Sequence, residues 1–256
     1  MVSIKISVTL LAAFIASTSA VPTEAVSIHK RAQVLAAGTS PVTGSLPDYD
    51  LIFRASGYLA KDDCPLSVAI TTCYAAKLSS KLDENLDNGI GGADAYTQSN
   101  FVTTGALEAT GATTKFTFKY FIDSALQTPS GYEMKLIQVV SKEPVANGSL
   151  TKVWFDVRNN KAGIYAFNDT NPVVSVPLSS LTNKTTLQTW IVKGGSTGYV
   201  DIDIKDAETG ASILKYHENR PNTRDSYRFR IGVTRSVKEN PYPYLTYFGD
   251  YSIQAL

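Results

Sequence analysis

Residues 152–158 read Lys-Val-Trp-Phe-Asp-Val-Arg, in which the apolar residues Val153, Phe155 and Val157 alternate with mostly polar ones. A period of two predicts a β-strand with one face toward a core and the other toward water. The turn sequence Asn-Asn-Lys at 159–161 then leads into a second apolar run. This stretch therefore predicts a β-hairpin and points to an all-β fold.

The same alternation recurs through the second half of the chain. Apolar side chains alternate with Lys and Thr at 115–120 and with Asp and Lys at 200–205. Short strands with turn signals every eight to twelve residues or so are typical of an all-β sandwich. We predict one sandwich over residues 96–256, with further strands at 213–217, 227–234 and 244–253.

The segment before residue 96 has a different pattern. Val68, Ala69, Leu78 and Leu82 recur at near-helical spacing, Asp63 can cap a helix, and Pro65 suits a first turn. The sequence therefore predicts a helix over residues 63–86, within a lead segment 32–95 that joins the sandwich in a single domain. An all-β domain can be as long as residues 32–256 without dividing into two domains.

The N-terminus resembles a secretory signal. Lys5 precedes the mostly apolar stretch Ile6–Ile15, and Thr18-Ser19-Ala20 provides the small residues that signal peptidase prefers. The apolar stretch is too short for a membrane anchor. The dibasic pair Lys30-Arg31 resembles a kexin-type processing site of the eukaryotic, especially fungal, secretory pathway. We predict a signal peptide at 1–20, a propeptide at 21–31, and a secreted, extracellular protein that begins at Ala32 and does not engage a membrane.

The net charge and the small number of histidines and cysteines argue against a nucleic-acid-binding or a metal-binding protein. Removing residues 1–31 takes three basic and one acidic side chain from totals of 24 and 23, which leaves a net charge near −1. A nearly neutral chain argues against nucleic acid as a partner. After removal of residues 1–31, His217 is the one remaining histidine, and Cys64 and Cys73 are the two cysteines. These residues are too few for a zinc site of the usual ligand spacing, so we expect no metal and no cofactor. We expect the cysteines to form a disulfide and the protein to be a monomer.

Three Asn-X-Ser/Thr triplets lie in polar stretches between apolar runs, where a glycan would remain exposed. We predict N-glycosylation at Asn147, Asn168 and Asn183.

A sheet with one polar face must present that face to water or to a water-like ligand such as a polysaccharide. Trp154 shares its parity with the polar residues Asp156 and Arg158, so it could stack against a sugar. The alternative, a ring folded over the sheet edge to complete the core, is favoured because large aromatic residues are mostly buried. Trp190 is expected in the core.

The C-terminal strands carry a family resemblance. Residues 227–236, Tyr-Arg-Phe-Arg-Ile-Gly-Val-Thr-Arg-Ser, and residues 247–250, Tyr-Phe-Gly-Asp, resemble the closing strands of the β-jelly-roll polysaccharide lyases, the alginate and glucuronan lyase group. Residues 135–140 resemble their central Gln-x-His strand, and residues 215–217 fall where the preceding strand should lie. The resemblance covers roughly 96–256 and implies an antiparallel β-jelly roll, a concanavalin A-like sandwich, here with one N-terminal helix.

The resemblance also implies chemistry. A uronate lyase must neutralise the sugar carboxylate, remove the proton at C5 and protonate the leaving oxygen. Gln138 and Arg230 match the carboxylate-binding positions of the family, but Val140 stands in place of the histidine and Arg228 in place of a tyrosine. His217, Tyr216 or Thr234 could substitute. We thus predict Gln138, His217, Tyr216 and Arg230 as catalytic residues, and as substrate-binding residues Lys135, Trp154, Arg228 and Arg235.

Each of these residues has a structural alternative. Gln138 could be a solvated strand residue, and a lone histidine such as His217 is more often structural. The arginines at 228, 230 and 235 could attract an acidic glycan or could pair with Asp201, Asp203 and Asp225.

Three functions remain open at this stage. The first is a lyase that cleaves a uronate-containing polysaccharide by β-elimination. The second is a glycan-binding or wall-associated protein of the same fold that lacks catalysis. The third is a secreted structural or host-interacting protein without a glycan ligand.

The processing prediction has a direct test. N-terminal sequencing of the protein secreted by a host with a kexin-type protease should begin at Ala32. A Lys30→Ala/Arg31→Ala variant should retain a longer N-terminus, because the basic pair is the recognition element. Secreted wild-type protein that still carries residues 21–31 would contradict the prediction.

Overall fold

The computed structural model describes residues 31–46, 49, 51–81, 84–87, 96–103, 112–128, 133–141, 151–166, 170–194, 198–219, 227–236 and 243–256. They belong to one compact unit, Arg31–Leu256. The predicted signal peptide and the propeptide up to Lys30 lie outside the described residues. Within the described ranges, no helix is both long enough and apolar enough to cross a membrane.

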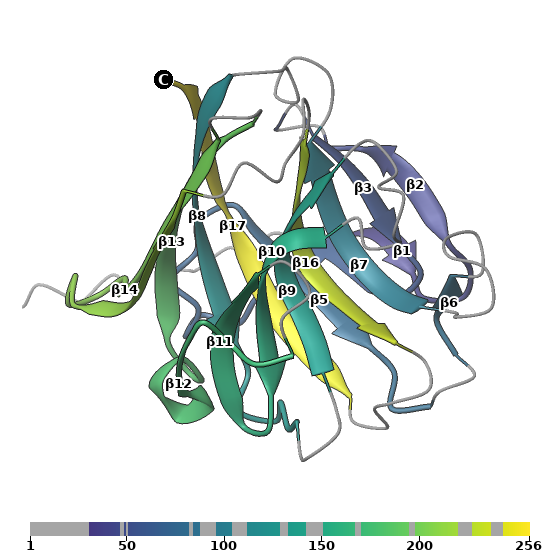
Figure 1. The fold of residues 1–256 in the computed structure, drawn as a ribbon. Coiled ribbons are helices and arrows are strands. Elements are labelled where there is room, and N and C mark those ends of the chain that lie inside the picture. Colours follow the sequence, from purple (N-terminus) through teal and green to yellow (C-terminus); the bar gives the residue numbers. More distant parts are fainter. Residues whose placement is uncertain are drawn as a thin grey trace, which may run out of the picture. The chain divides into compact units, whose positions relative to one another are not determined.

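Two antiparallel sheets pack face to face as a β-sandwich (Figure 1). In spatial order, the described strands of sheet A are β1 (Gln33–Ala37), β4 (Tyr58–Lys61), β5 (Cys73–Leu78), β17 (Tyr244–Ala255), β8 (Thr113–Ile122), β13 (Thr185–Lys193), β14 (Tyr199–Asp206) and β15 (Ser212–Glu218). Those of sheet B are β12 (Val174–Pro177), β11 (Lys161–Ala166), β10 (Thr151–Arg158), β9 (Glu133–Ser141), β16 (Tyr227–Ser236), β7 (Tyr96–Thr103), β3 (Leu51–Ala55) and β2 (Val42–Ser45), with β6 (Leu86–Asp87) beside β7. A short 3₁₀ helix, Leu178–Ser180, follows β12.

The predicted alternation is confirmed in sheet A. In β8 up to Tyr120 and in β14 up to Ile204, every second residue is buried and its neighbours are partly exposed. The hairpin from β10 to β11 turns at Asn159 and Asn160, which both have positive φ, as a tight two-residue hairpin turn requires. The sequence period therefore identified which face of these strands enters the core.

Aromatic side chains from both sheets meet in the core. Phe229 of β16 stacks on Phe116 of β8, with ring centroids 4.2 Å apart, and meets Trp190 of β13 edge-on at 5.5 Å. Trp190 is fully buried, as expected. Such rings bury large apolar areas and fix the distance between the layers.

The predicted helix over residues 63–86 is wrong. Within the described residues this segment contains β5 and β6, and β5 lies between β4 and β17 inside sheet A. Its sequence, Cys-Tyr-Ala-Ala-Lys-Leu, is buried on both sides, so it lacks the alternation of a half-exposed strand. A short apolar run of this kind cannot be distinguished from a buried helix by periodicity. The segment 32–95 thus contributes strands to both sheets.

A disulfide closes the loop before β5. Cys64 and Cys73 are bonded, as predicted. Val68 and Ile70 of the loop pack with Phe121 and Tyr247 in a small apolar cluster.

The same loop is also held by Asp250, whose carboxylate accepts hydrogen bonds from the backbone N–H groups of Thr71 and Thr72 and pairs with Lys119 at 3.0 Å. The loop is therefore fixed to sheet A by covalent, apolar and polar contacts.

Gly232 allows β16 to lie against β7. Its φ is +146°, a conformation that side chains disfavour, and a Cβ atom placed there would lie 2.1 Å from the carbonyl oxygen of Ser99. No residue with a side chain fits without moving one of the two strands.

We predict that Gly232→Ala lowers the free energy of unfolding by more than about 2 kcal/mol, because it adds overpacking to an unfavourable φ. Gly210→Ala is the matched control: Gly210 also has positive φ, at +72°, but no atom lies within 4 Å of the position that a Cβ atom would take there. Its cost should be about 1 kcal/mol. Equal losses in urea denaturation would show that crowding at Gly232 has no effect.

Candidate functional site

The outer face of sheet B carries a row of polar residues across its central strands. Gln138 of β9 lies directly opposite Arg230 of β16, and Trp154 of β10 lies on the other side of Gln138. Tyr165 of β11 continues the row. Paired positions in neighbouring strands bring side chains on one face within reach of each other. The two residues predicted to bind a carboxylate therefore share a face and a row.

Arg230 has no protein partner among the described residues. It is largely buried, and its Nε is inaccessible and without a hydrogen bond. Burial lowers the pKa of Arg230, and the neighbouring cations Arg228 and Arg54 lower it further. Arginine remains charged in proteins, and a buried guanidinium without a carboxylate is costly. An anionic ligand at this point would relieve that cost.

Next to this row, a chain of hydrogen bonds crosses β9, β16 and β7. The Gln138 side-chain amide donates to Thr234 Oγ1 at 3.2 Å. The Asn100 amide nitrogen donates both to Thr234 Oγ1 at 2.7 Å and to Gln98 Oε1 at 2.9 Å. Gln138, Asn100 and Gln98 are almost fully buried, whereas Thr234 is partly exposed.

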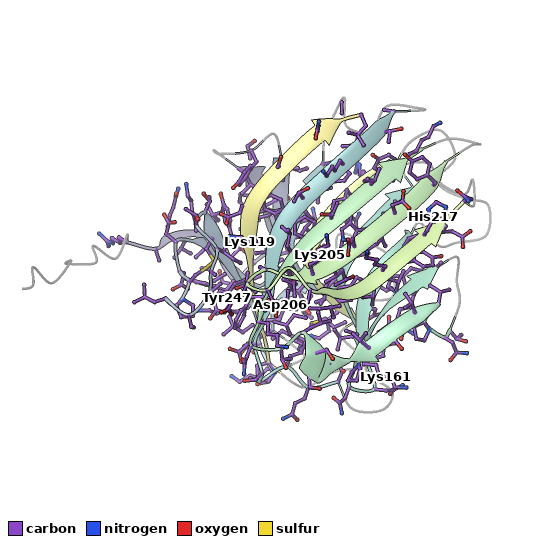
Figure 2. All side chains as sticks on the ribbon, turned by 90° about the vertical axis from the view of Figure 1, so that its left-hand side faces the viewer. Lys119, Lys161, Lys205, Asp206, His217 and Tyr247 are labelled. Carbon is purple, nitrogen blue, oxygen red and sulfur yellow. A yellow bond between two sulfur atoms is a disulfide. The ribbon has the colours of Figure 1, made fainter. Side chains whose placement is uncertain are left out.

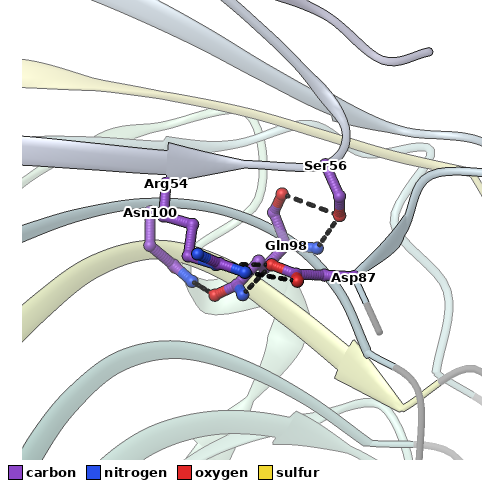
Figure 3. Close-up of polar contacts among 5 residues, drawn as sticks. All are labelled: Arg54, Ser56, Asp87, Gln98 and Asn100. Carbon is purple, nitrogen blue, oxygen red and sulfur yellow. Dashed lines mark hydrogen bonds and ion pairs between the residues drawn. The ribbon is translucent and has the colours of Figure 1, made fainter. Parts of the chain in front are cut away.

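The chain ends at an ion pair between the buried Asp87 and the partly exposed Arg54 (Figure 3). Gln98 Nε2 donates to Asp87 Oδ2 at 2.7 Å, and the Arg54 guanidinium binds both Asp87 oxygens at 2.7 and 2.6 Å. Ser56 fixes the backbone of Gln98 through a hydrogen bond of 3.0 Å from the Gln98 N–H to its hydroxyl. The bidentate pair neutralises Arg54, so the charge of Arg54 is compensated within the protein.

The other end of the row is a charged and aromatic cluster. Trp154 stacks on Tyr165 at 5.8 Å, and the Lys135 ammonium lies over the Trp154 ring at 5.6 Å. Trp154 is buried, at 5% exposure, yet it lies on the polar face and not between the sheets. The structure therefore supports neither sequence-based alternative fully: this ring is neither an open sugar platform nor part of the main core.

Asp156 lies beneath this cluster and is fully buried. Its carboxylate accepts hydrogen bonds from the Met134 N–H at 2.9 Å, the Trp154 Nε1–H at 3.2 Å and the Arg158 Nε–H at 2.8 Å. Arg158 also pairs with Glu133. Burial outweighs these contacts and raises the pKa of Asp156 to about 6. The carboxylate has no exposed surface, which suits a structural role.

A pocket of about 210 Å³ lies at this end of sheet B. Its walls include Glu133, Arg158, Tyr165 and Asn171. It lies at the margin of the polar row and provides one polar recess beside it.

His217 and Tyr216 lie in the other sheet. Both belong to β15, the edge strand of sheet A, and His217 faces outward, where its Nδ1 contacts Asp201 (Figure 2). The Tyr216 hydroxyl donates to Glu218 at 2.9 Å. The structure thus separates both residues from Gln138 and Arg230. Sequence parity gives the face of a strand but not which of two sheets holds it, which explains the incorrect grouping.

Arg235 is also displaced from the expected position. It is 1% exposed, and its guanidinium donates to Thr97 Oγ1 at 3.0 Å and to the Ser79 carbonyl at 2.6 Å. It cannot contact a ligand on the outer face without leaving these partners. Arg235 shares its parity with the core residues Phe229, Ile231 and Val233, so it lies on the inner face of β16.

Arg228 keeps its expected face. It is partly exposed and lies opposite Val140, which is buried. The position of the family histidine is therefore filled by an apolar side chain that cannot transfer a proton. Asp201 pairs with His217 and Asp203 with Lys205 and Lys215, so these two acids do not neutralise the arginines of β16.

Of the predicted glycosylation sites, Asn147 and Asn168 lie outside the described residues. Asn183 is exposed, and its side-chain oxygen accepts a hydrogen bond from the Ser124 N–H at 3.2 Å. A glycan there would extend into solvent. Glycosylation at all three sites remains a prediction.

Arg54, Asp87, Gln98 and Asn100 are not among the residues predicted from the sequence. Gln98 and Asn100 lie on one face of β7, but their neighbours Thr97 and Ser99 are polar as well, so the sequence does not show which face they occupy. Asp87 and Arg54 lie in the segment that was assigned to a lead with a helix, where no pattern connects them. Among the described residues, no group of three or more His, Cys, Asp or Glu side chains is arranged to hold a metal ion.

Two solved structures show the same architecture. The endo-β-1,4-glucuronan lyase of the fungus Trichoderma reesei superposes with a TM-score of 0.56 at 14% sequence identity, over 84% of this chain and 94% of that one. The chain has a β-jelly-roll fold. A substrate-bound variant of a family 7 alginate lyase superposes with a TM-score of 0.50 at 8% identity, over 72% of this chain and 78% of that one. No family model and no curated protein matches this chain by sequence.

The buried Asp156 gives a testable pH dependence. Its pKa of about 6 in the folded protein lies above the ordinary value of 3.8, so folding favours the neutral form. Its contribution to stability is present below pH 4 and is lost as the pH rises through 6. We predict that the stability of wild-type protein relative to Asp156→Asn falls by more than about 1.4 kcal/mol between pH 4 and pH 7.

The control for this experiment is Glu208→Gln, which removes an exposed carboxylate from a turn of sheet A. Urea denaturation of the three proteins at each pH measures the difference. A constant gap between wild type and Asp156→Asn over this range would show that the pKa of Asp156 is not raised.

Proposed function

We propose that the protein is secreted and binds a uronate-containing polysaccharide across the outer face of sheet B, with the uronate carboxylate at Arg230 and Gln138. The observation that carries the proposal is the Arg230 guanidinium, which is largely buried and has no partner among the described residues. A carboxylate would supply the missing acceptor and charge, and arginine binds carboxylates through geometrically matched hydrogen bonds.

The charges around this point favour one anionic group at the centre. Arg54 is neutralised by Asp87 on one side, and Arg158 is held by Asp156 on the other. Arg230 lies between these pairs along the sheet. A polymer with one carboxylate in each sugar can place a charge at Arg230 while its hydroxyl groups meet the neighbouring polar side chains.

Secretion is part of the proposal. The disulfide between Cys64 and Cys73 suits an oxidising compartment. The predicted signal peptide and the exposed Asn183 support the same location. An extracellular protein would meet acidic polysaccharides directly.

β-Elimination is the second candidate function. It is favoured by the jelly-roll fold shared with a glucuronan lyase and an alginate lyase, and by Gln138 and Arg230 at two positions that the resemblance links to the reaction. The reaction also needs a base for the C5 proton and an acid for the leaving oxygen. Val140, at the position of the family histidine, cannot transfer a proton. Polysaccharide binding is therefore the first candidate function, and β-elimination is the second.

The experiment measures binding and reaction together. We predict that Arg230→Gln weakens binding to polyglucuronate, alginate or polygalacturonate, whichever binds wild type best, by at least about tenfold, because a charge-assisted hydrogen bond contributes about 1.5–3 kcal/mol. Lys115→Gln on the outer face of sheet A is the matched control, because it removes one positive charge elsewhere. Isothermal titration calorimetry gives the affinities.

The same mixtures are followed by ultraviolet absorbance for the unsaturated product of elimination. A rise in absorbance that Arg230→Gln abolishes would establish the lyase. Binding without new absorbance would leave the binding function. Failure of wild type to bind any acidic polysaccharide, or equal binding by Arg230→Gln, would contradict the proposal.

A further inference from the structure

The hydrogen-bond chain on the outer face of sheet B has a fixed direction. Asp87 carries an ionised carboxylate, because Arg54 binds both of its oxygens, and a carboxylate can only accept hydrogen bonds. The group of Gln98 that faces Asp87 must therefore be its NH₂. The Gln98 oxygen then faces Asn100, which must present its own NH₂.

This direction reaches Thr234. The Asn100 amide nitrogen donates one hydrogen to Gln98 and the other to Thr234 Oγ1. The Gln138 amide also donates to Thr234 Oγ1. A hydroxyl oxygen has two lone pairs and one hydrogen. Both lone pairs of Thr234 are thus occupied, and its hydrogen is the group that remains to be donated.

Thr234 is also the accessible end of the chain. It is partly exposed, whereas Asn100, Gln98 and Asp87 are almost fully buried. Among the described residues, no acceptor receives the Thr234 hydrogen. Arg230 lies on the same strand and the same face, and it too offers N–H groups without a protein acceptor. The exposed end of the chain and the cation therefore both present donors.

We propose that Thr234 determines specificity at this site: its hydroxyl, oriented by the chain from Asp87, donates to a carboxylate oxygen of the uronate whose charge Arg230 neutralises. The inference rests on the proposed function and adds Thr234 to the residues that bind the carboxylate. Asn100, Gln98 and Asp87 are positioning residues, because they act through the direction that they impose on Thr234. The ligand class is a polyuronate with free carboxylates, in preference to the neutral polymer of the same linkage.

The test compares Thr234→Val with Thr234→Ser. Valine has nearly the shape of threonine but cannot donate, whereas serine keeps the hydroxyl. With the polyuronate that wild type binds best, we expect Thr234→Val to raise Kd about tenfold and Thr234→Ser to stay within about threefold of wild type. With the carboxyl-reduced polymer, Thr234→Val and wild type should bind alike. Thr117→Val on the outer face of sheet A is the matched control and should not change binding.

A double-mutant cycle tests the positioning role. If Asn100 acts through Thr234, Asn100→Ala should weaken binding in the wild-type background and have little further effect in Thr234→Val, because the two changes then share one interaction. A purely structural role for Asn100 would give equal losses in both backgrounds. Thermal unfolding of each variant establishes that it is folded, and Thr234→Ala replaces Thr234→Val if the valine variant is not.

The outcomes separate the two proposals. Loss of binding in Arg230→Gln with unchanged binding in Thr234→Val would overturn the role of Thr234 and leave the proposed function intact. Equal effects of Thr234→Val on the charged and the reduced polymer would overturn the specificity role. Absence of any binding by wild type would overturn the proposed function itself.

Discussion

The register of β16 between β7 and β9 is the constraint on which the candidate site depends. It places Arg230 opposite Gln138 on one side and opposite Val102 on the other, while Phe229 enters the core. A shift of one residue would move every one of these side chains to the opposite face. Gly232 holds this register, because only glycine allows the close approach to Ser99. The packing of the core and the composition of the polar face are thus set by the same strand.

The polar face shows how a sheet can hold carboxylates out of water. Asp87 with Arg54, and Asp156 with Arg158, are compensated by direct ion pairs and by amide or indole donors. Leaving one member of such a pair without the other would be strongly destabilising. Arg230 departs from this rule. Uncompensated buried groups of this kind are common where a ligand completes the structure, since local stability is given up for affinity.

Much of the fold could be predicted from the sequence, because the strands of the second half are half-buried and their alternation reports the buried face. The helix prediction failed at β5, which is buried on both sides and therefore has no alternation. For the site, the prediction that Gln138 and Arg230 act together agrees with their position in one row. The association of His217 with them failed, because the assignment of β15 to sheet A depends on pairings that no local pattern contains.

Asp87, Gln98 and Asn100 show a second limit. Their contacts join β6, β7 and β16, which are distant in sequence, and each contact depends on the order of strands in the finished sheet. The residues around Gln98 and Asn100 are polar on both faces of β7, so no alternation marks the outer face, and the donor and acceptor roles follow only from the complete set of neighbours.

The position of the last two strands has a consequence for biosynthesis. β17 lies between β5 and β8, and β16 lies between β9 and β7, so each sheet is divided until the final thirty or so residues have been made. Neither half can close early, and pairings between segments so distant in sequence form slowly. A nascent chain would emerge with exposed apolar strands and open edges, and would depend on chaperones until β16 and β17 have left the ribosome. Removal of residues 227–256 would therefore abolish folding altogether.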